Sequence, residues 1–367
     1  MEQKKHVFLA LDGLRGVAAI TVVFLHGWLL LGGAAGASLF ERAHLAVDLF
    51  FLMSGVVIAH AYDHRFASGM SIGQFMRARI IRLYPLYLIG SILPLAKEAS
   101  KWAAGMSAHS GYEMVLQAVS AVTMIPLKTG SDPNLFPFNW PAWSLFFEMV
   151  INFAYVLAFP LLTTRRLAIL VTLTGVGLAY CGVVGGHLNP GNLWSTFLWG
   201  FVRVGFSFPL GVLIYRLLRA GSLPRVNIPL PLIFIVAVGM TMPHMPEVLK
   251  PIYDVAIVLF VLPLLVCAGI QKEPQRGQKI YSFLGTISYP LYMLHMTLFF
   301  AAQFVCFRLY GDDKMLLEPF IFSALVVIAV ALAWAMDRLY DRPVRRLATG
   351  LFSRKASVDR TSVIGRT

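Results

Sequence analysis

Ten apolar runs, each close to the length that a helix needs to cross a bilayer, dominate this 367-residue chain. A bilayer core takes roughly 20 apolar residues per helix. Charged residues make up only 13% of the sequence and hydrophobic residues 58%, so the apolar excess must face lipid. We therefore predict an all-α, polytopic integral membrane protein of about ten transmembrane helices. The predicted spans are 14–31, 46–62, 80–96, 143–163, 167–185, 194–218, 229–243, 252–270, 284–307 and 318–338.

An eleventh apolar run, 112–127, is short and contains Glu113 and Gln117. Lys and Arg gather in alternate loops when ten spans are counted, as in Arg165 and Arg166, and this bias marks the cytoplasmic side. An eleventh span would reverse every later loop. We therefore predict ten spans with both termini in the cytoplasm, and 112–127 lying on or dipping into the membrane within a long outer loop.

The whole of 1–346 is predicted to be a single membrane domain, followed by a polar, basic cytoplasmic tail at 347–367. The net charge is +13, and the basic residues that produce it lie between the apolar spans and not on a soluble basic surface. The lipid bilayer is therefore the predicted partner, and nucleic acid is not. Cys181, Cys267 and Cys306 show no ligand spacing, so neither a metal site nor a disulfide is predicted.

The first span carries two ionisable residues, Arg15 and His26, eleven residues apart. Eleven steps of about 100° bring both side chains to one face of the helix, and the rise separates them by about 16 Å. This geometry suits a long ligand with an anionic end at Arg15 and a reactive end at His26. The alternative is that Arg15 flanks the membrane beside Asp12 and that His26 is an interior histidine.

Two carboxylates are predicted at the outer level of His26: Asp48, which opens the second span, and Glu148, near the outer end of the fourth. A neighbouring carboxylate orients a histidine and makes it a better base. We therefore predict that Asp48 or Glu148 contacts His26. For Asp48, stabilisation of a helix N-terminus is the competing interpretation.

Further polar residues interrupt later spans, where an unpaired charge would cost several kcal/mol. Arg203 lies in the middle of the sixth span, Asp254 near the outer end of the eighth and His295 midway along the ninth. Arg203 is predicted to have a buried partner or to face a water-filled cavity, whereas for His295 an interior position and a substrate contact both stay open. At the inner membrane surface, three arginines serve either as topology anchors or as phosphate ligands: Arg77, Arg79 and Arg82.

Six sequence blocks, in order along nearly the whole chain, resemble those of the acyltransferase 3 family. They are Leu11–Gly16 with His26 (the Arg-x10-His opening), Asp48–Gly55 (FFxxSG), Arg77–Pro85 (the basic entry to the third helix), Trp143–Glu148 (WSLxxE), Gly285–His295 (GxxSYxLYxxH) and Tyr340–Pro343. Phe147 stands where the family often has an acid, and Asp341 where it usually has Glu.

The resemblance implies an O-acyltransferase of the bacterial cytoplasmic (inner) membrane. It would take an acyl group from cytoplasmic acyl-CoA, commonly acetyl-CoA, and deliver it to a hydroxyl of an outer or lipid-linked glycan. The implied donor-binding residues are Arg15, Arg77, Arg79 and Arg82; the implied catalytic residues are His26, Glu148 and Asp48; and the implied substrate contacts are Trp143, Ser144, Arg203 and His295. No metal is implied.

Three other functions are weighed against this one. A transporter or flippase would use Arg203 and the other polar residues along a path, but no matching pair of broken helices is evident. A receptor or scaffold leaves the outer His26 cluster without purpose. The membrane-bound O-acyltransferase superfamily performs a similar reaction on another fold, and its Asn and His arrangement is not evident here.

Overall fold

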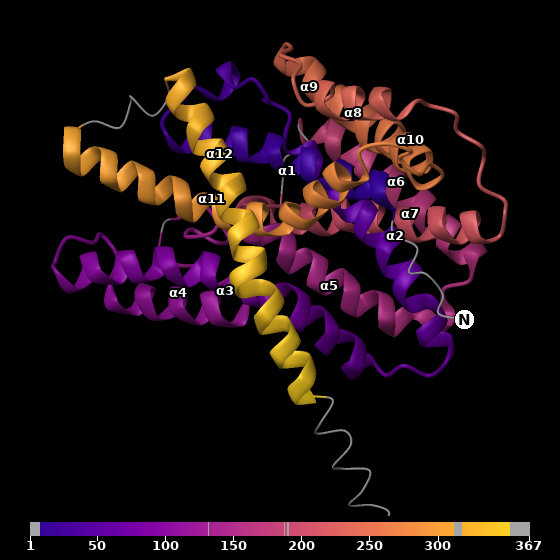
Figure 1. Ribbon diagram of the computed structural model, residues 1–367, viewed down its shortest axis with the longest axis horizontal. Helices are drawn as coiled ribbons and strands as arrows, with labels where there is room; N and C mark the ends of the chain where they lie inside the picture. The colour runs from indigo at the N-terminus through magenta and orange to yellow at the C-terminus, as the bar shows by residue number, and fades with distance from the viewer. Residues whose placement is uncertain (1–7, 131, 187, 189–190, 312–317, 353–367) are drawn as a thin grey trace, which may run out of the picture.

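The computed structural model describes residues 8–130, 132–186, 188, 191–311 and 318–352, and these residues form helices and no named strand (Figure 1). The fold is all-α, as predicted. Two five-residue π-helical segments interrupt it: Ile257–Val261 joins α9 to α10, and Asp337–Asp341 extends α12, which continues as helix to residue 352. The helices are α1 (Leu9–Leu30), α2 (Leu45–Ala67), α3 (Ile72–Ala103), α4 (Gly111–Thr123), α5 (Ala142–Ala158), α6 (Thr164–Val184), α7 (Phe197–Arg219), α8 (Leu230–Gly239), α9 (Lys250–Ala256), α10 (Leu262–Ile270), α11 (Gln278–Tyr310) and α12 (Pro319–Met336).

Within the described residues, nine helices are long and apolar enough to cross a membrane, and they coincide with nine of the ten predicted spans. The tenth, predicted at 229–243, forms only the ten-residue helix α8. We call the end of the bundle at which α1 begins the inner end, and the opposite end the outer end. Gln271 bonds to the Pro224 carbonyl at the inner end, whereas the Arg42 amide bonds to Thr241 at the outer end. The chain therefore crosses the bundle here with a short helix and extended flanks.

The run 112–127 forms α4, whose 13 residues rise only about 20 Å. A capping box between Ser110 and Glu113 begins this helix. It lies beside α3 in Figure 1, and the hydroxyls of Tyr84 and Tyr87, in the middle of α3, donate to carbonyls near the end of α4. Gln117 then bonds to Thr129 on the returning chain. The segment dips into the bundle from the outer end and returns, so it is not an eleventh span.

Close packing of α1 with α11 and of α2 with α7 forms the centre of the molecule. Glycine makes this possible: a Cβ at Gly55 would lie 2.1 Å from the Phe208 carbonyl oxygen, and one at Gly211 would lie 2.0 Å from that of Leu52. Small residues allow such backbone approach between membrane helices. The polar residues of α1, α2, α5 and α11 are thereby held facing one another inside the bundle.

Candidate active site

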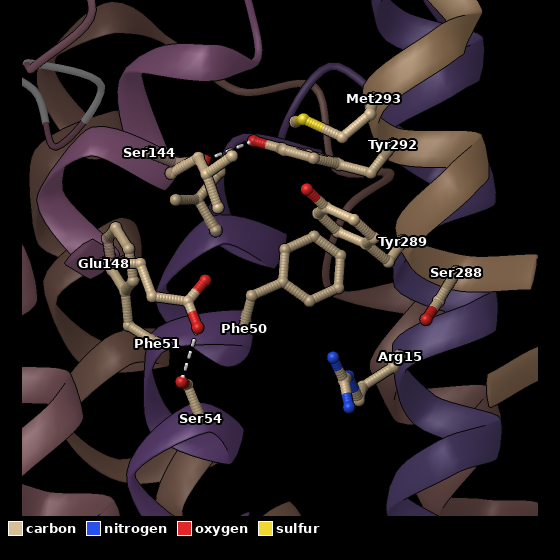
Figure 2. A pocket seen from close by; sticks show the side chains of 12 residues that line it. Arg15, Phe50, Phe51, Ser54, Ser144, Glu148, Ser288, Tyr289, Tyr292 and Met293 are labelled. Carbon is tan, nitrogen blue, oxygen red and sulfur yellow. Dashed lines mark hydrogen bonds between the residues drawn. The ribbon is translucent and has the colours of Figure 1, made fainter. Parts of the chain in front are cut away.

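A cavity of about 60 Å³, which we call the inner cavity, lies between α1, α2, α5 and α11. Figure 2 shows Arg15 of α1 pointing into it from one wall and Glu148 of α5 from the opposite wall. The hydroxyl of Ser54 on α2 donates to Glu148 Oε1 over 2.8 Å, and the guanidinium of Arg79 on α3 donates to the same oxygen over 2.8 Å. The negative charge of Glu148 is therefore compensated by the guanidinium of Arg79, and the two partners of Glu148 come from two other helices, α2 and α3.

Arg15 has neither a hydrogen bond nor an ion pair with any residue that the structure describes. The charges that act on it come from Asp12, Glu148, Arg79 and Arg82. Arg15 therefore lies among two carboxylates and two other guanidinium groups, both of which have acidic partners of their own. The guanidinium of Arg15 is half-buried at the cavity, and guanidinium groups form bidentate hydrogen bonds with carboxylate and phosphate oxygens.

The structure separates the three arginines that were predicted at the start of the third span. Arg79 and Arg82 are three residues apart and share one face of α3; Arg82 lies 5.4 Å from the Tyr289 ring centroid and 3.7 Å from Asp341. Arg77 is about 200° around the helix from Arg79 and stacks on Phe352, 4.6 Å from the ring centroid. Arg77 therefore does not join the cluster at Arg15.

A second, larger cavity of about 260 Å³, which we call the outer cavity, contains His26. Tyr292 and Val47 line both cavities, and the Tyr292 hydroxyl lies 2.9 Å from Ser144 Oγ. Arg15 and His26 therefore lie in neighbouring cavities with Tyr292 between them. The side chains that line the outer cavity are Val22, Leu25, His26, Leu29, Ala43, His44, Val47, Asn134, Trp140, Trp143, Asn192 and Tyr292.

The contact that orients His26 comes from His295 of α11. Nδ1 of His26 lies 2.9 Å from Nε2 of His295, and Nδ1 of His295 lies 3.0 Å from the Leu291 carbonyl oxygen. Because a carbonyl only accepts, Nδ1 of His295 carries its proton and Nε2 of the neutral ring accepts from His26. This bond fixes the proton of His26 on Nδ1. Nε2 of His26 keeps its lone pair, which a base or a nucleophile requires.

The predicted contact between Asp48 and His26 is wrong. Asp48 faces α7, where Arg203 donates from Nη2 to Oδ2 over 2.6 Å and from Nε to Oδ1 over 3.2 Å, with both side chains 1% exposed. Arg203 also lies 5.2 Å from the Trp143 ring centroid. The pair lines neither of the two cavities described above, and Arg203 supports Trp143 in the outer wall.

The predicted contact between Glu148 and His26 is wrong as well. α5 begins at Ala142, so Glu148 lies six residues, about 9 Å, below the outer end and opens into the inner cavity. Of the predicted substrate residues, Trp143 lines the outer cavity and Ser144 the inner one, whereas His295 is 1% exposed behind His26.

Sequence reasoning did not single out several residues that line the cavities. The hydroxyl residues Tyr289 and Tyr292 fall in a recognised block, and the spacing of that block placed them on one helix with His295. His44 directly precedes the second span at the outer level of His26, which was a usable signal. The amides of Asn134 and Asn192 come from loops, and no local pattern indicated them.

Residues 8–338 match the family described as "Acyltransferase domain". A protein of Rhizobium radiobacter, "Protein 2 in picA locus", is 36% identical to this chain over 159 residues, which cover 40% of this chain and 80% of that protein. No solved structure matches the chain. The family match spans every residue that lines the two cavities.

Proposed function

Because this chain belongs to the acyltransferase 3 family and is a multi-pass membrane acyltransferase, we propose its acyl donor, its acceptor and its catalytic residue. The donor is a cytoplasmic acyl-CoA, with acetyl-CoA as the first candidate. The acceptor is a hydroxyl of an extracytoplasmic or lipid-linked glycan, at the cytoplasmic membrane of a bacterium. His26 is the catalytic residue.

One observation carries this proposal: a single helix, α1, presents Arg15 to the inner cavity and His26 to the outer cavity. The two positions are about 16 Å apart along the helix. A donor with an anionic head and a reactive thioester at the end of a long flexible arm needs this separation. A free solute that a transporter moves across the membrane as one unit does not need this separation.

The donor head would stay at the inner end, because moving phosphates out of water costs far more than any single contact returns. Arg15, Arg79 and Arg82 supply the guanidinium groups there, and Arg77 is left out of the donor site because it stacks elsewhere. Glu148 would hold Arg79 in place from the opposite wall. The donor arm would then extend past Tyr292 toward His26.

At the outer cavity, two routes use the same lone pair on Nε2 of His26. In the first, Nε2 takes the proton of the acceptor hydroxyl while its oxygen attacks the thioester carbonyl, and the CoA thiolate leaves and receives that proton. In the second, Nε2 attacks the thioester itself and expels the thiolate; the acceptor hydroxyl then takes the acyl group from His26, which regains its Nε2 lone pair, and the hydroxyl proton passes to the thiolate. His295 orients the ring in both routes.

The surface glycans of the source organism test this function. We expect mass spectrometry of glycans from a deletion strain to show the loss of acetyl or succinyl groups while the sugar chains remain on the cell surface. The wild-type gene should restore the acyl groups. Loss of the whole glycan from the surface would support a transporter instead, and unchanged acylation would contradict the proposal.

A further inference from the structure

A second histidine, His44, lines the same outer cavity as His26. It is the residue immediately before α2, and its side chain is 9% exposed. His44 Nε2 lies 3.0 Å from Oδ2 of Asp254 on α9, a carboxylate that is fully buried. A histidine held in this way by a buried carboxylate has a fixed ring orientation and a fixed tautomer.

Two arginines and two aspartates surround His44. Arg42 donates from Nη1 to both oxygens of Asp254, each over 3.2 Å, and so already matches the charge of that carboxylate. Arg203 pairs with Asp48 and also donates to the His44 carbonyl oxygen over 3.0 Å. Two arginines therefore balance two aspartates around His44, and each of these charges already has a partner of opposite sign.

The tautomer of His44 follows from its partner. A carboxylate only accepts, so Nε2 of His44 carries the proton and Nδ1 of the neutral ring is an acceptor. Nδ1 has no hydrogen-bond partner among the residues that the structure describes. The outer cavity is therefore lined by two histidines that each keep one ring nitrogen able to accept a hydrogen bond, Nε2 of His26 on α1 and Nδ1 of His44 directly before α2.

Two fixed acceptors facing one cavity suit a ligand that brings two hydroxyl donors. The remaining wall has the aromatic rings of Trp140 and Trp143 and the amides of Asn134 and Asn192. Flat aromatic surfaces combined with amides and hydroxyl acceptors match the alternating apolar faces and hydroxyl edges of a sugar.

We propose that His44, held by Asp254, binds the acceptor by accepting a hydrogen bond from a second hydroxyl next to the one that reacts at His26. The proposal rests on the proposed function and adds the recognition of a polyhydroxylated acceptor. His44 forms no covalent bond and moves no proton. It selects acceptors that carry two neighbouring hydroxyls, and it sets which of them reaches Nε2 of His26.

Two substitutions at one position separate this role from a structural one. In His44→Gln the longer side chain can keep the bond to Asp254 but presents no acceptor at the position of Nδ1. In His44→Asn the shorter side chain places its oxygen where Nδ1 was and gives up the bond to Asp254. If His44 binds the acceptor, His44→Gln should be the more damaging substitution. If His44 only links the outer loop to α9, His44→Asn should be the more damaging one.

The assay uses the purified full-length protein, radiolabelled acetyl-CoA and the surface glycan of the source organism, stripped of its esters by mild alkali. We expect His44→Gln to raise the KM for glycan by roughly three- to tenfold, the value of one neutral hydrogen bond, and His44→Asn to stay closer to wild type. The KM for acetyl-CoA should be unchanged in both. The unchanged KM for acetyl-CoA shows that each variant keeps its folded donor site.

The outcomes distinguish the two proposals. If wild type transfers acetyl and His44→Gln has the wild-type KM for glycan, or if only His44→Asn is impaired, the role of His44 is wrong while the acyltransfer stands. If wild type releases CoA but never acylates the glycan, the proposed acceptor class fails, and the role of His44 fails with it.

Discussion

The His26→Ala variant is expected to lose at least about 100-fold of the wild-type rate of acetyl transfer, since a positioned base contributes roughly 10²- to 10⁴-fold. The loss follows from the removal of Nε2, the lone pair that His295 leaves free in the outer cavity. CoA release is measured with a thiol reagent, and transfer is measured by radiolabel in the glycan. The melting temperature in detergent should stay near that of wild type, because His26 is half-buried beside a cavity and replacing it opens no closed core.

The matched control is His64→Ala, which removes an exposed histidine on the inner part of α2. It should transfer acetyl at the wild-type rate. His295 provides a second comparison: His295→Gln keeps an oxygen that can accept from Nδ1 of His26, whereas His295→Ala does not. The first should therefore retain more activity than the second. Normal turnover by His26→Ala would show that the chemistry occurs elsewhere.

The Arg15→Gln variant is expected to raise the KM for acetyl-CoA by roughly 10- to 100-fold, the range of a lost hydrogen bond to a charged group. Arg15 lines the inner cavity without a partner among the described residues, so its guanidinium is available to the donor. The KM for glycan should change less than twofold, because the acceptor is proposed to bind in the other cavity. Initial rates with one substrate varied at a time give both constants.

Arg77→Gln is the matched control for Arg15→Gln. Arg77 carries the same charge near the inner end, but it stacks on Phe352 and faces away from the cluster. We expect its KM for acetyl-CoA to stay within about twofold of wild type. Equal effects of the two substitutions would mean that the donor responds to the overall positive charge of the inner surface, and the specific site at Arg15 would be disproved.

The arrangement of Arg15 and His26 could be predicted because both residues lie on one helix. Helical periodicity fixes which side chains share a face and how far apart they are, and neither quantity depends on the rest of the chain. The structure places the two residues in separate cavities beside α1, in agreement with the predicted separation. Nine of the ten predicted spans form long helices for the same local reason.

The partners of buried charges could not be predicted, because they depend on the rotation and depth of one helix relative to another. Asp48 pairs with Arg203, which is 155 residues away, and Glu148 pairs with Arg79. Each acid had several candidate partners at a similar predicted level, and the sequence contains no measure of the rotation that decides between them. The bond between His26 and His295 spans 269 positions and was missed for the same reason.

The sequence also did not determine the conformation of two short apolar segments, 229–243 and 112–127. The run 229–243 is apolar enough to suggest a full span, yet prolines at its start leave only ten helical residues. For 112–127, charge bias excluded a span but did not distinguish a surface helix from one that dips inward. Tertiary hydrogen bonds from Tyr84 and Tyr87 of α3 decide that question.

The central claim is that the donor enters at the inner end and the acyl group leaves at the outer end. Membrane vesicles of opposite orientation, prepared from cells that make the protein and loaded with ester-free glycan, test it most directly. Radiolabelled acetyl-CoA is added outside the vesicles, and label in the enclosed glycan is counted. Inside-out vesicles should acylate the glycan and right-side-out vesicles should not, with His26→Ala inactive in both. Equal labelling by sealed vesicles of both orientations, or labelling only in right-side-out vesicles, would contradict the two-cavity path along α1.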